Sequence, residues 1–270
     1  MSKKLIFFDI DGTIIDEKGY IPPSTVRAIR SAREQGALCV INTGRPYSHI
    51  DPTVKAIGFD AYVCSCGQHL EHRGQVVSHV EFAPELCRQI VELTRQCRLD
   101  TVYEAEEGIW FDVTHDAETD SIRTGWEQVV RRGLEADQSV DAPGFCFDKF
   151  CAFVRPDSDL PRFLAFIEQY GSVIYREGGM LEIIRRGYSK EYGLKQMIAL
   201  LGVELADCFA IGDSTNDLPM LRCVPHGIAM GNAPDEVKEE AEYVTAPLHQ
   251  DGIARVLARY GLIPEKPEFV

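Results

Sequence analysis

Asp9 and Asp11 are the first residues whose types and spacing could do chemistry. They stand two apart in residues 9–13, DIDGT, directly after the apolar residues 5–8. If this segment is extended, both carboxylates point to the same side, and they repel unless one is protonated or a cation lies between them. One carboxylate could then attack phosphorus while the other moves a proton. The same residues also suit a turn in which Asp9 and Asp11 only shape the backbone.

A second carboxylate-rich segment, residues 212–217 (GDSTND), follows the apolar residues 208–211. In an open α/β sheet, ligands bind outside the carboxyl ends of the strands, so this segment and Asp9 would lie in the same region. Asp9, Asp11 and Asp213 could share one hard cation, and Mg²⁺ prefers such oxygen ligands. Asp217 could hold Asn216 or a metal-bound water in place. Capping of a helix explains these residues equally well.

Thr43 and Lys190 are candidates for contacts to a phosphate group. The Thr43 hydroxyl, with nearby amides such as that of Gly44, could bind a phosphoryl oxygen. Capping of a helix that begins near Pro46 explains Thr43 equally well. Lys190 follows Ser189 at the start of a helical pattern, where it could stabilise negative charge on the phosphate and the nucleophile. An isolated lysine at such a place is ordinarily a solvated surface residue.

A regular alternation of strand and helix patterns must position these residues. Buried-strand patterns occur at 4–10, 37–41, 61–64, 208–211 and 227–230. Helical patterns occur at 24–35, 189–201 and 217–221, and Pro46 is suited to open another helix. This order predicts an α/β fold in which both ends of the chain build one doubly wound, Rossmann-like parallel sheet.

The middle of the chain has a different pattern. Strand pairs are expected around the turns at 107–108 and 178–179, together with helical faces at 85–97 and 161–170. We interpret residues 83–187 as an inserted α+β domain. Residues 1–82 and 188–270 then form the core.

Composition excludes several classes of partner. The chain has 28 basic and 42 acidic residues, and this net charge of -14 repels polyanions, so we expect no nucleic-acid partner. A small phosphorylated metabolite is compatible, because a metal and a few basic groups reverse the charge locally. The apolar run at 5–8 is too short for a signal peptide or a membrane span, so we expect a cytoplasmic protein without membrane contact.

The cysteines indicate structure more than chemistry. Nine cysteines in a chain without a secretion signal are expected to be reduced thiols, mostly buried. Cys64, Cys66, His69 and His72 have residue types that could bind zinc, but their spacing differs from that of zinc fingers. A partly buried hairpin is the favoured interpretation of this segment.

Four motifs in order resemble the haloacid dehalogenase superfamily: DIDGT at 9–13, TGR at 43–45, SK at 189–190 and GDSTND at 212–217. More narrowly, they resemble its Cof-like sugar-phosphatase group, which carries a large α/β cap between the second and third motifs. AMGNA at 229–233 and DGIA at 251–254 are similar to that group as well. The chain departs from the group at Cys66, where an asparagine is usual, and at Glu191, where glycine usually follows the lysine.

The resemblance implies a Mg²⁺-dependent phosphatase that acts on small phosphorylated metabolites through an aspartyl-phosphate intermediate, with residues 83–187 as the cap domain. In this interpretation Asp9 is the nucleophile and Asp11 is the general acid and base. Thr43 and Lys190 hold the phosphoryl group.

The resemblance also assigns the metal and the remaining phosphate contacts. Mg²⁺ would be held by Asp9, the main-chain carbonyl of Asp11 and Asp213, with Asp217 supporting the site. Gly12, Gly44 and Asn216 complete the expected phosphate contacts. Two alternatives stay open: a phosphomutase of the phosphomannomutase type, and a phosphometabolite-binding protein without catalysis.

Overall fold

The chain divides into two structural units, and one long insertion supplies most of the second. The structure, a computed structural model, describes residues 3–113, 126–127, 129–130, 133–135 and 138–264, so both ends of the predicted core and part of the predicted insert lie outside the described residues. The core unit comprises Met1–Arg45, Ile50–Ser78 and Ser189–Val270. The inserted unit comprises Pro46–His49 and His79–Tyr188.

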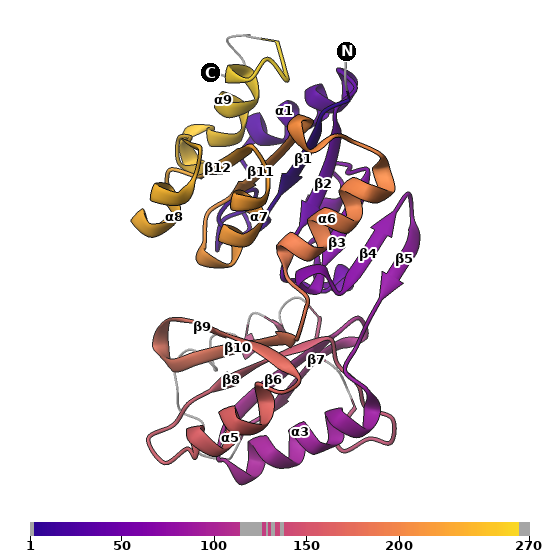
Figure 1. The fold of residues 1–270 in the computed structure, drawn as a ribbon, viewed down its shortest axis with the longest axis vertical. Helices are drawn as coiled ribbons and strands as arrows, with labels where there is room; N and C mark the ends of the chain where they lie inside the picture. The colour runs from indigo at the N-terminus through magenta and orange to yellow at the C-terminus, as the bar shows by residue number, and fades with distance from the viewer. Residues whose placement is uncertain (1–2, 114–125, 128, 131–132, 136–137, 265–270) are drawn as a thin grey trace. The chain divides into compact units, whose positions relative to one another are not determined.

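The core unit contains an eight-stranded sheet with the order β13-β12-β11-β1-β2-β3-β4-β5 (Figure 1). Its strands are β1 (Leu5–Phe8), β2 (Leu38–Asn42), β3 (Ala61–Cys64), β4 (His69–His72), β5 (Gln75–His79), β11 (Cys208–Gly212), β12 (His226–Ala229) and β13 (Tyr243–Val244). The six strands from β13 to β3 pair in parallel, and β4 pairs antiparallel with β3. The predicted doubly wound parallel sheet is therefore confirmed.

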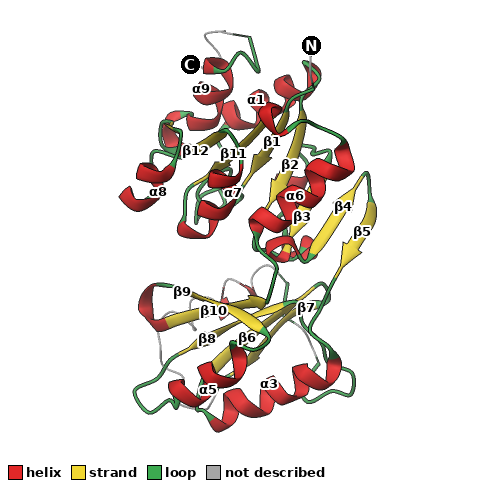
Figure 2. Ribbon diagram, viewed as in Figure 1, coloured by secondary structure: helices red, strands yellow, loops and turns green. Residues whose placement is uncertain are grey.

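Helices cover both faces of this sheet (Figure 2). They are α1 (Pro23–Glu34), α2 (Pro52–Lys55), α6 (Lys190–Leu201), α7 (Leu218–Cys223), α8 (Asp235–Glu240) and α9 (Gly252–Arg259). Leu5 and Phe7 of β1 pack with Leu194 of α6 on one face. Because side chains alternate along a strand, Cys39 of β2 lies on the other face, where its thiol contacts the Ile29 carbonyl of α1.

The helix expected at Pro46 is only a single 3-10 turn. Pro46 does not open an α-helix; a short 3-10 helix spans Tyr47–His49, and the four-residue helix α2 begins at Pro52. A residue that precedes proline avoids the helical region, and Asp51, directly before Pro52, is accordingly extended with φ -54° and ψ 136°. A helix from Pro46 therefore cannot continue through Asp51. The first strand is also shorter than expected and spans Leu5–Phe8, because a turn begins at Ile10, whose carbonyl accepts the amides of Thr13 and Ile14.

The inserted unit is an antiparallel sheet with the order β7-β6-β8-β10-β9. Its elements are α3 (Pro84–Gln96), β6 (Asp100–Ala105), β7 (Gly108–Asp112), β8 (Lys149–Phe153), α5 (Leu160–Ile167), β9 (Gly171–Tyr175) and β10 (Met180–Arg185). Both predicted hairpins, β6 with β7 and β9 with β10, are present. The helices α3 and α5 cover one face of the sheet, where Ile90 and Phe163 join a core with Tyr103, Phe150 and Ile183 (Figure 2).

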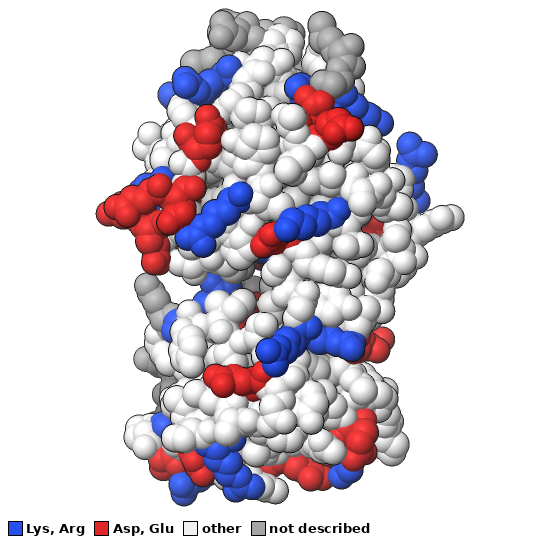
Figure 3. All heavy atoms as spheres, in the orientation of Figure 1, with Lys and Arg blue, Asp and Glu red and all other residues white. Residues whose placement is uncertain are grey.

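The surface carries both signs of charge. Lys and Arg side chains are interspersed with Asp and Glu on the face of each unit seen in Figure 3. No helix of the described residues is long and apolar enough to cross a membrane. All nine cysteines are free thiols, and six of them are buried.

Candidate active site

The candidate site begins where β1 and β11 end side by side. The two strands pair in parallel, with Phe8 opposite Ile211, and the Asp9 amide donates a hydrogen bond to the Ile211 carbonyl at 3.0 Å. Asp9 after β1 and Asp213 after β11 therefore leave the sheet at the same edge. One carboxylate oxygen from each of Asp9, Asp213 and Asp217 lies within 4.8 Å of the other two.

Lys190 lies against these carboxylates. It is the first residue of α6, whose N-cap is Ser189, and it is 2% exposed. Its Nζ donates to Asp9 Oδ1 at 2.7 Å and to Asp217 Oδ1 at 2.6 Å, while Asn42 Nδ2 donates to its main-chain carbonyl at 2.9 Å. Burial alone would lower the Lys190 pKa, but the charges of Asp217 and Asp9 raise it above its ordinary value. Lys190 is thus not a solvated surface lysine.

Asp217 anchors the loop that follows β11. It is fully buried, and its Oδ2 accepts the amides of Asp213 and Ser214, both at 3.0 Å. With Lys190 on Oδ1, both carboxylate oxygens of Asp217 have hydrogen-bond partners. Asp217 therefore fixes the positions of Lys190 and of the Asp213 backbone.

Asp213 is held from the side of the DIDGT segment. Thr13 Oγ1 donates to Asp213 Oδ1 at 3.0 Å. Gly12 has φ +75°, and a Cβ at this position would lie 2.1 Å from Asp213 Oδ2, so the turn requires glycine both for its conformation and for space. Asn232 Nδ2 donates to the Gly12 carbonyl at 2.9 Å and fixes the other side of this turn.

The site has more negative charge than Lys190 offsets. Burial, followed by the charge of Asp217, raises the pKa of Asp9 well above its ordinary value, although Lys190 lowers it. Burial and Asp217 also raise the pKa of Asp213 to about 7. Three converging carboxylates, of which Asp9 and Asp213 have a raised pKa, are a favourable place for a cation.

Asp11 lies outside this cluster, and its partner is a residue that sequence reasoning missed. Its side chain is 59% exposed, and its carboxylate accepts hydrogen bonds from Arg45, with Nε to Oδ2 at 2.9 Å. The same guanidinium donates through Nη1 to Asp51 Oδ2 at 2.6 Å. Arg45 is the last residue of the TGR motif, so the motif could have drawn attention to it. Nothing in the motif indicates that Arg45 pairs with Asp11.

Thr43, Gly44 and Asn216 have more local contacts. Thr43 is buried directly after β2, where its hydroxyl accepts the Arg45 amide at 3.2 Å, and Gly44 lies between these two residues. Asn216 lies in the 3-10 helix Thr215–Asp217, and its side-chain oxygen accepts a hydrogen bond from the Ser214 hydroxyl. Asn216 therefore binds its own loop in this structure, rather than Lys190.

The segment that contains Cys64, Cys66, His69 and His72 forms a hairpin, as its pattern indicated. β3 pairs with β4, with Cys64 opposite His69. Among the described residues, two groups of side chains converge as possible metal ligands. One is Asp9, Asp213 and Asp217, and the other lies in the inserted unit. The four cysteine and histidine residues of this hairpin belong to neither group. Cys66 is buried in a left-handed turn, with φ +53°.

Comparison with known proteins identifies the family. The model of the haloacid dehalogenase-like hydrolase family matches residues 6–257. YkrA of Bacillus subtilis (strain 168) is 30% identical to the chain over 271 residues, which cover 97% of this chain and all of YkrA. The pyridoxal phosphate phosphatase YbhA of Escherichia coli (strain K12) is 28% identical over 279 residues, 95% of this chain and 98% of YbhA.

Solved structures share the fold. The structure of BT4131, a sugar phosphatase of haloacid dehalogenase subclass IIB, superposes with a TM-score of 0.81 at 24% identity and covers 97% of this chain and 100% of its own. The likeness therefore extends over both the core unit and the inserted unit. The chain belongs to the haloacid dehalogenase-like hydrolase family and is an enzyme of that family that hydrolyses phosphate monoesters.

Proposed function

We propose that the protein hydrolyses phosphate monoesters of small metabolites in a Mg²⁺-dependent reaction, through an aspartyl-phosphate on Asp9. The observation that carries the proposal is the position of the buried Lys190 Nζ, which bridges Asp9 and Asp217 beside Asp213. Pyridoxal phosphate, the substrate in the name of YbhA, is an example of the size of substrate that we expect, and sugar phosphates are another.

The residues present fit Mg²⁺. The donor set of Asp9 and Asp213 is made of carboxylate oxygens, and Mg²⁺ accepts such ligands together with water. We assign the main-chain carbonyl of Asp11 as a third oxygen ligand. Asp217 would act behind these ligands, since its own oxygens already accept hydrogen bonds from Lys190 and from the amides of Asp213 and Ser214. Bound there, Mg²⁺ would supply the positive charge that lets a phosphate dianion approach Asp9.

Asp9 and Asp11 divide the covalent work between them. A carboxylate oxygen of Asp9 attacks phosphorus, the ester P–O bond breaks, and Asp11 gives a proton to the departing oxygen. Asp11 then takes a proton from a water molecule that attacks the aspartyl-phosphate, which releases inorganic phosphate and restores Asp9. The exposed position of the Asp11 side chain suits this role, because its carboxyl can reach the leaving group of a substrate that enters from solvent.

The remaining predicted residues bind the phosphoryl group. Lys190 offers an ammonium group that is already directed at Asp9. The Thr43 hydroxyl accepts the Arg45 amide, and its own proton is available for a phosphoryl oxygen. We assign further phosphate contacts to Gly12, Gly44 and Asn216, the last of these through its side-chain amide.

A phosphate-release assay on a panel of phosphorylated metabolites tests the proposal. With Mg²⁺, the wild-type protein should release phosphate from at least one member, and excess chelator should stop the release until Mg²⁺ is restored. The panel should include a hexose bisphosphate, because isomerised monophosphate in place of free phosphate would identify a mutase. Full turnover in chelator would exclude the Mg²⁺-dependent mechanism.

A further inference from the structure

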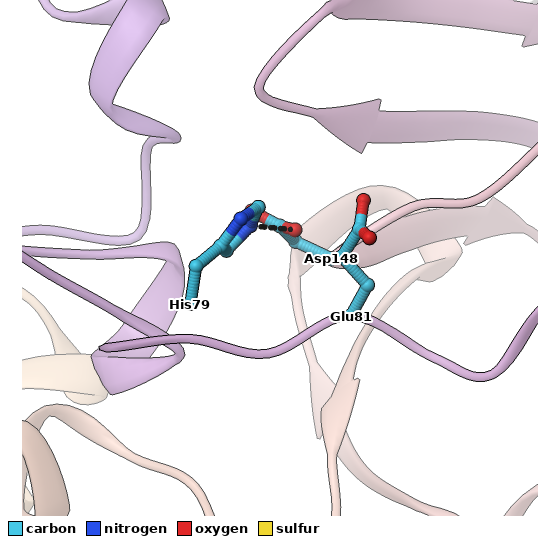
Figure 4. A group of neighbouring side chains, drawn as sticks. All are labelled: His79, Glu81 and Asp148. Carbon is cyan, nitrogen blue, oxygen red and sulfur yellow. Dashed lines mark hydrogen bonds and ion pairs between the residues drawn. The ribbon is translucent and has the colours of Figure 1, made fainter. Parts of the chain in front are cut away.

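A second cluster of possible metal ligands lies in the inserted unit and has no part in the proposed hydrolysis. It comprises His79, Glu81 and Asp148 (Figure 4). One His79 nitrogen lies 2.8 Å from Asp148 Oδ1, and single ligand atoms of all three residues lie within 4.8 Å of one another. The three residues come from two segments that are far apart in the sequence but adjacent in space.

The backbone holds these two segments together. The Phe82 amide donates to the Phe147 carbonyl at 3.1 Å, and both phenyl rings are buried with their centroids 5.5 Å apart. The Asp148 amide donates to the Glu104 carbonyl of β6 at 2.9 Å. Because these contacts fix the backbone next to Glu81 and Asp148, the fold brings the side chains of the cluster close together before any ion binds.

The spacing along each segment has a simple cause. His79 and Glu81 are two residues apart where the chain leaves β5, so in an extended backbone their side chains point to the same side. Asp148 stands directly before β8 and meets them from the neighbouring segment. His-x-Glu at 79–81 was a readable signal in the sequence, although the position of Asp148 was not.

The local charge favours a cation. The Asp148 side chain is fully buried, and a quarter of the His79 side chain (25%) is exposed, which leaves a route for an ion from solvent. A neutral imidazole with two carboxylates carries two negative charges, which a divalent ion would neutralise.

The donor set and the distances select the kind of ion. An imidazole nitrogen among the ligands suits zinc and its neighbours among the transition metals, whereas Mg²⁺ and Ca²⁺ prefer oxygen alone. Zinc lies about 2.0–2.2 Å from nitrogen and oxygen ligands, so two ligand atoms on one ion are at most about 4.4 Å apart. The ligand atoms of the three residues already lie within 4.8 Å of one another, so small side-chain movements are enough to bring them onto one ion.

We propose that His79, Glu81 and Asp148 bind a divalent transition-metal ion of the zinc class, with solvent completing the coordination. This site is distinct from the all-oxygen magnesium site of the core unit. The ion would tie the segment that leads into the inserted unit to the residue before β8.

Cobalt titration tests the site, since Co²⁺ replaces zinc and gives visible absorption that depends on its coordination. Metal-free full-length protein is titrated with Co²⁺ in excess Mg²⁺, which fills the core site, and Zn²⁺ is then added as competitor. We expect a saturable visible band that Zn²⁺ removes. His79→Gln and Glu81→Gln should each weaken Co²⁺ binding at least about 100-fold, since even residues behind the ligands change metal affinity by about 10–100-fold.

Two further variants separate this site from its alternatives. His249→Gln is the matched control, because His249 Nε2 lies 3.3 Å from Asp16 Oδ2 in a pair with one carboxylate, and this variant should keep the band. Asp213→Asn, which disables the core site, should keep it too. Circular dichroism verifies the fold of every variant. A wild-type protein without the band, or a band that survives both His79→Gln and Glu81→Gln in folded proteins, would overturn the proposal.

Discussion

Asp9 and Asp11 stand two residues apart, yet the structure gives them different surroundings. Asp9 is buried and accepts a hydrogen bond from Lys190, whereas Asp11 is exposed and pairs with Arg45. The proposed mechanism gives them different work as well. Substitution of each residue by asparagine should therefore have a different kinetic effect, although both changes remove one carboxylate.

Asp9→Asn should abolish turnover, because an amide is a poor nucleophile and a weaker ligand. Asp11→Asn should keep the nucleophile and the main-chain carbonyl assigned to the metal, and it should lose proton transfer, which is worth about 10²–10⁴ in rate. With p-nitrophenyl phosphate, whose leaving group needs little protonation, Asp11→Asn should release nitrophenol in a burst of about one equivalent per site and then turn over slowly. Rapid-mix absorbance measures this burst.

Trapping of phosphate on the protein provides the control for the burst. Acid-quenched Asp11→Asn should carry phosphate, and acid-quenched Asp9→Asn should carry none. An equally suppressed burst in both variants, with Mg²⁺ binding intact, would show that the two roles are wrongly assigned.

The sequence pointed to single residues better than to their pairings. Asp9, Asp213 and Lys190 were readable because each follows or begins a strongly patterned element. The contact between Arg45 and Asp11 was not readable from the sequence. The long Arg45 side chain is also held by Asp51, and the sequence does not show that Asp11 and Asp51 lie on either side of it. Burial of Lys190 was equally hidden, because the position of a lysine in a sequence says nothing about the two carboxylates that surround it.

At the scale of elements, the turn after β1 is the part that fits Asp213 most tightly. Gly12→Ala would place a Cβ 2.1 Å from Asp213 Oδ2, so Asp213 must move, and we expect Mg²⁺ affinity and phosphate release to fall at least about tenfold. Gly19 is the matched control: it has φ +83°, and no atom of the described residues lies within 4 Å of the place that a Cβ would take. Gly19→Ala should cost about 1 kcal/mol of stability through backbone strain and leave Mg²⁺ affinity unchanged.

Calorimetric Mg²⁺ titration and thermal unfolding of the two variants separate these effects. If Gly19→Ala weakened Mg²⁺ binding as much as Gly12→Ala, the loss would come from backbone strain alone. The argument from the space beside Asp213 would then fail.

The sheet of the inserted unit contains a buried ion-pair network. Glu182 of β10 accepts from Lys149 Nζ at 2.8 Å and from Arg176 Nε at 3.0 Å. Burial alone would raise the pKa of Glu182, but the charges of Lys149 and Arg176 have the larger combined effect and lower this pKa to about 2. Glu182→Gln would leave both cations without this charge and should lower the free energy of unfolding at pH 7 by about 3 kcal/mol.

The sign of the pH dependence follows from the lowered pKa. Glu182 has an ordinary pKa of 4.5, so its contribution is complete above that value and is lost as the pH falls towards about 2. The difference in unfolding free energy between wild type and Glu182→Gln should therefore narrow below pH 4.5. Urea unfolding across this range measures it. Glu92→Gln, which removes an exposed partner of Arg88, should change stability by less than about 1 kcal/mol at any pH. If the difference in unfolding free energy between wild type and Glu182→Gln stayed constant as the pH fell, the lowered pKa of Glu182 would be contradicted.

Elements with strong periodic patterns were predictable, and those set by local exceptions were not. Both hairpins of the inserted unit follow from apolar runs on either side of glycine-containing turns. The helix expected at Pro46 is limited to the 3-10 turn Tyr47–His49, because a second proline, Pro52, forces the residue before it to be extended.

At the scale of the whole molecule, the core site exists only when distant parts of the chain meet. Asp9 lies near the N-terminus, whereas Lys190 and Asp213 follow the entire insert. The proposed transition-metal site draws its ligands from within the inserted unit. The chain would therefore carry two cation sites, each confined to one unit and each with a different donor set.

Two cations should consequently protect different parts of the chain from hydrogen exchange. An ion that binds only the folded state adds RT ln(1 + [L]/Kd), about 2.7 kcal/mol at a hundredfold excess over its Kd, to the stability of the unit that holds it. Mg²⁺ should slow amide exchange at residues 9–13 and 212–217, and Zn²⁺ added in the presence of Mg²⁺ should slow it at 79–82 and 146–148. Asp213→Asn should lose only the first effect and His79→Gln only the second. Mass spectrometry of peptides from these segments reads both units in one experiment. Loss of both effects in either variant would mean that the two sites are coupled, because independent sites in separate units have no reason to respond to each other's ligands.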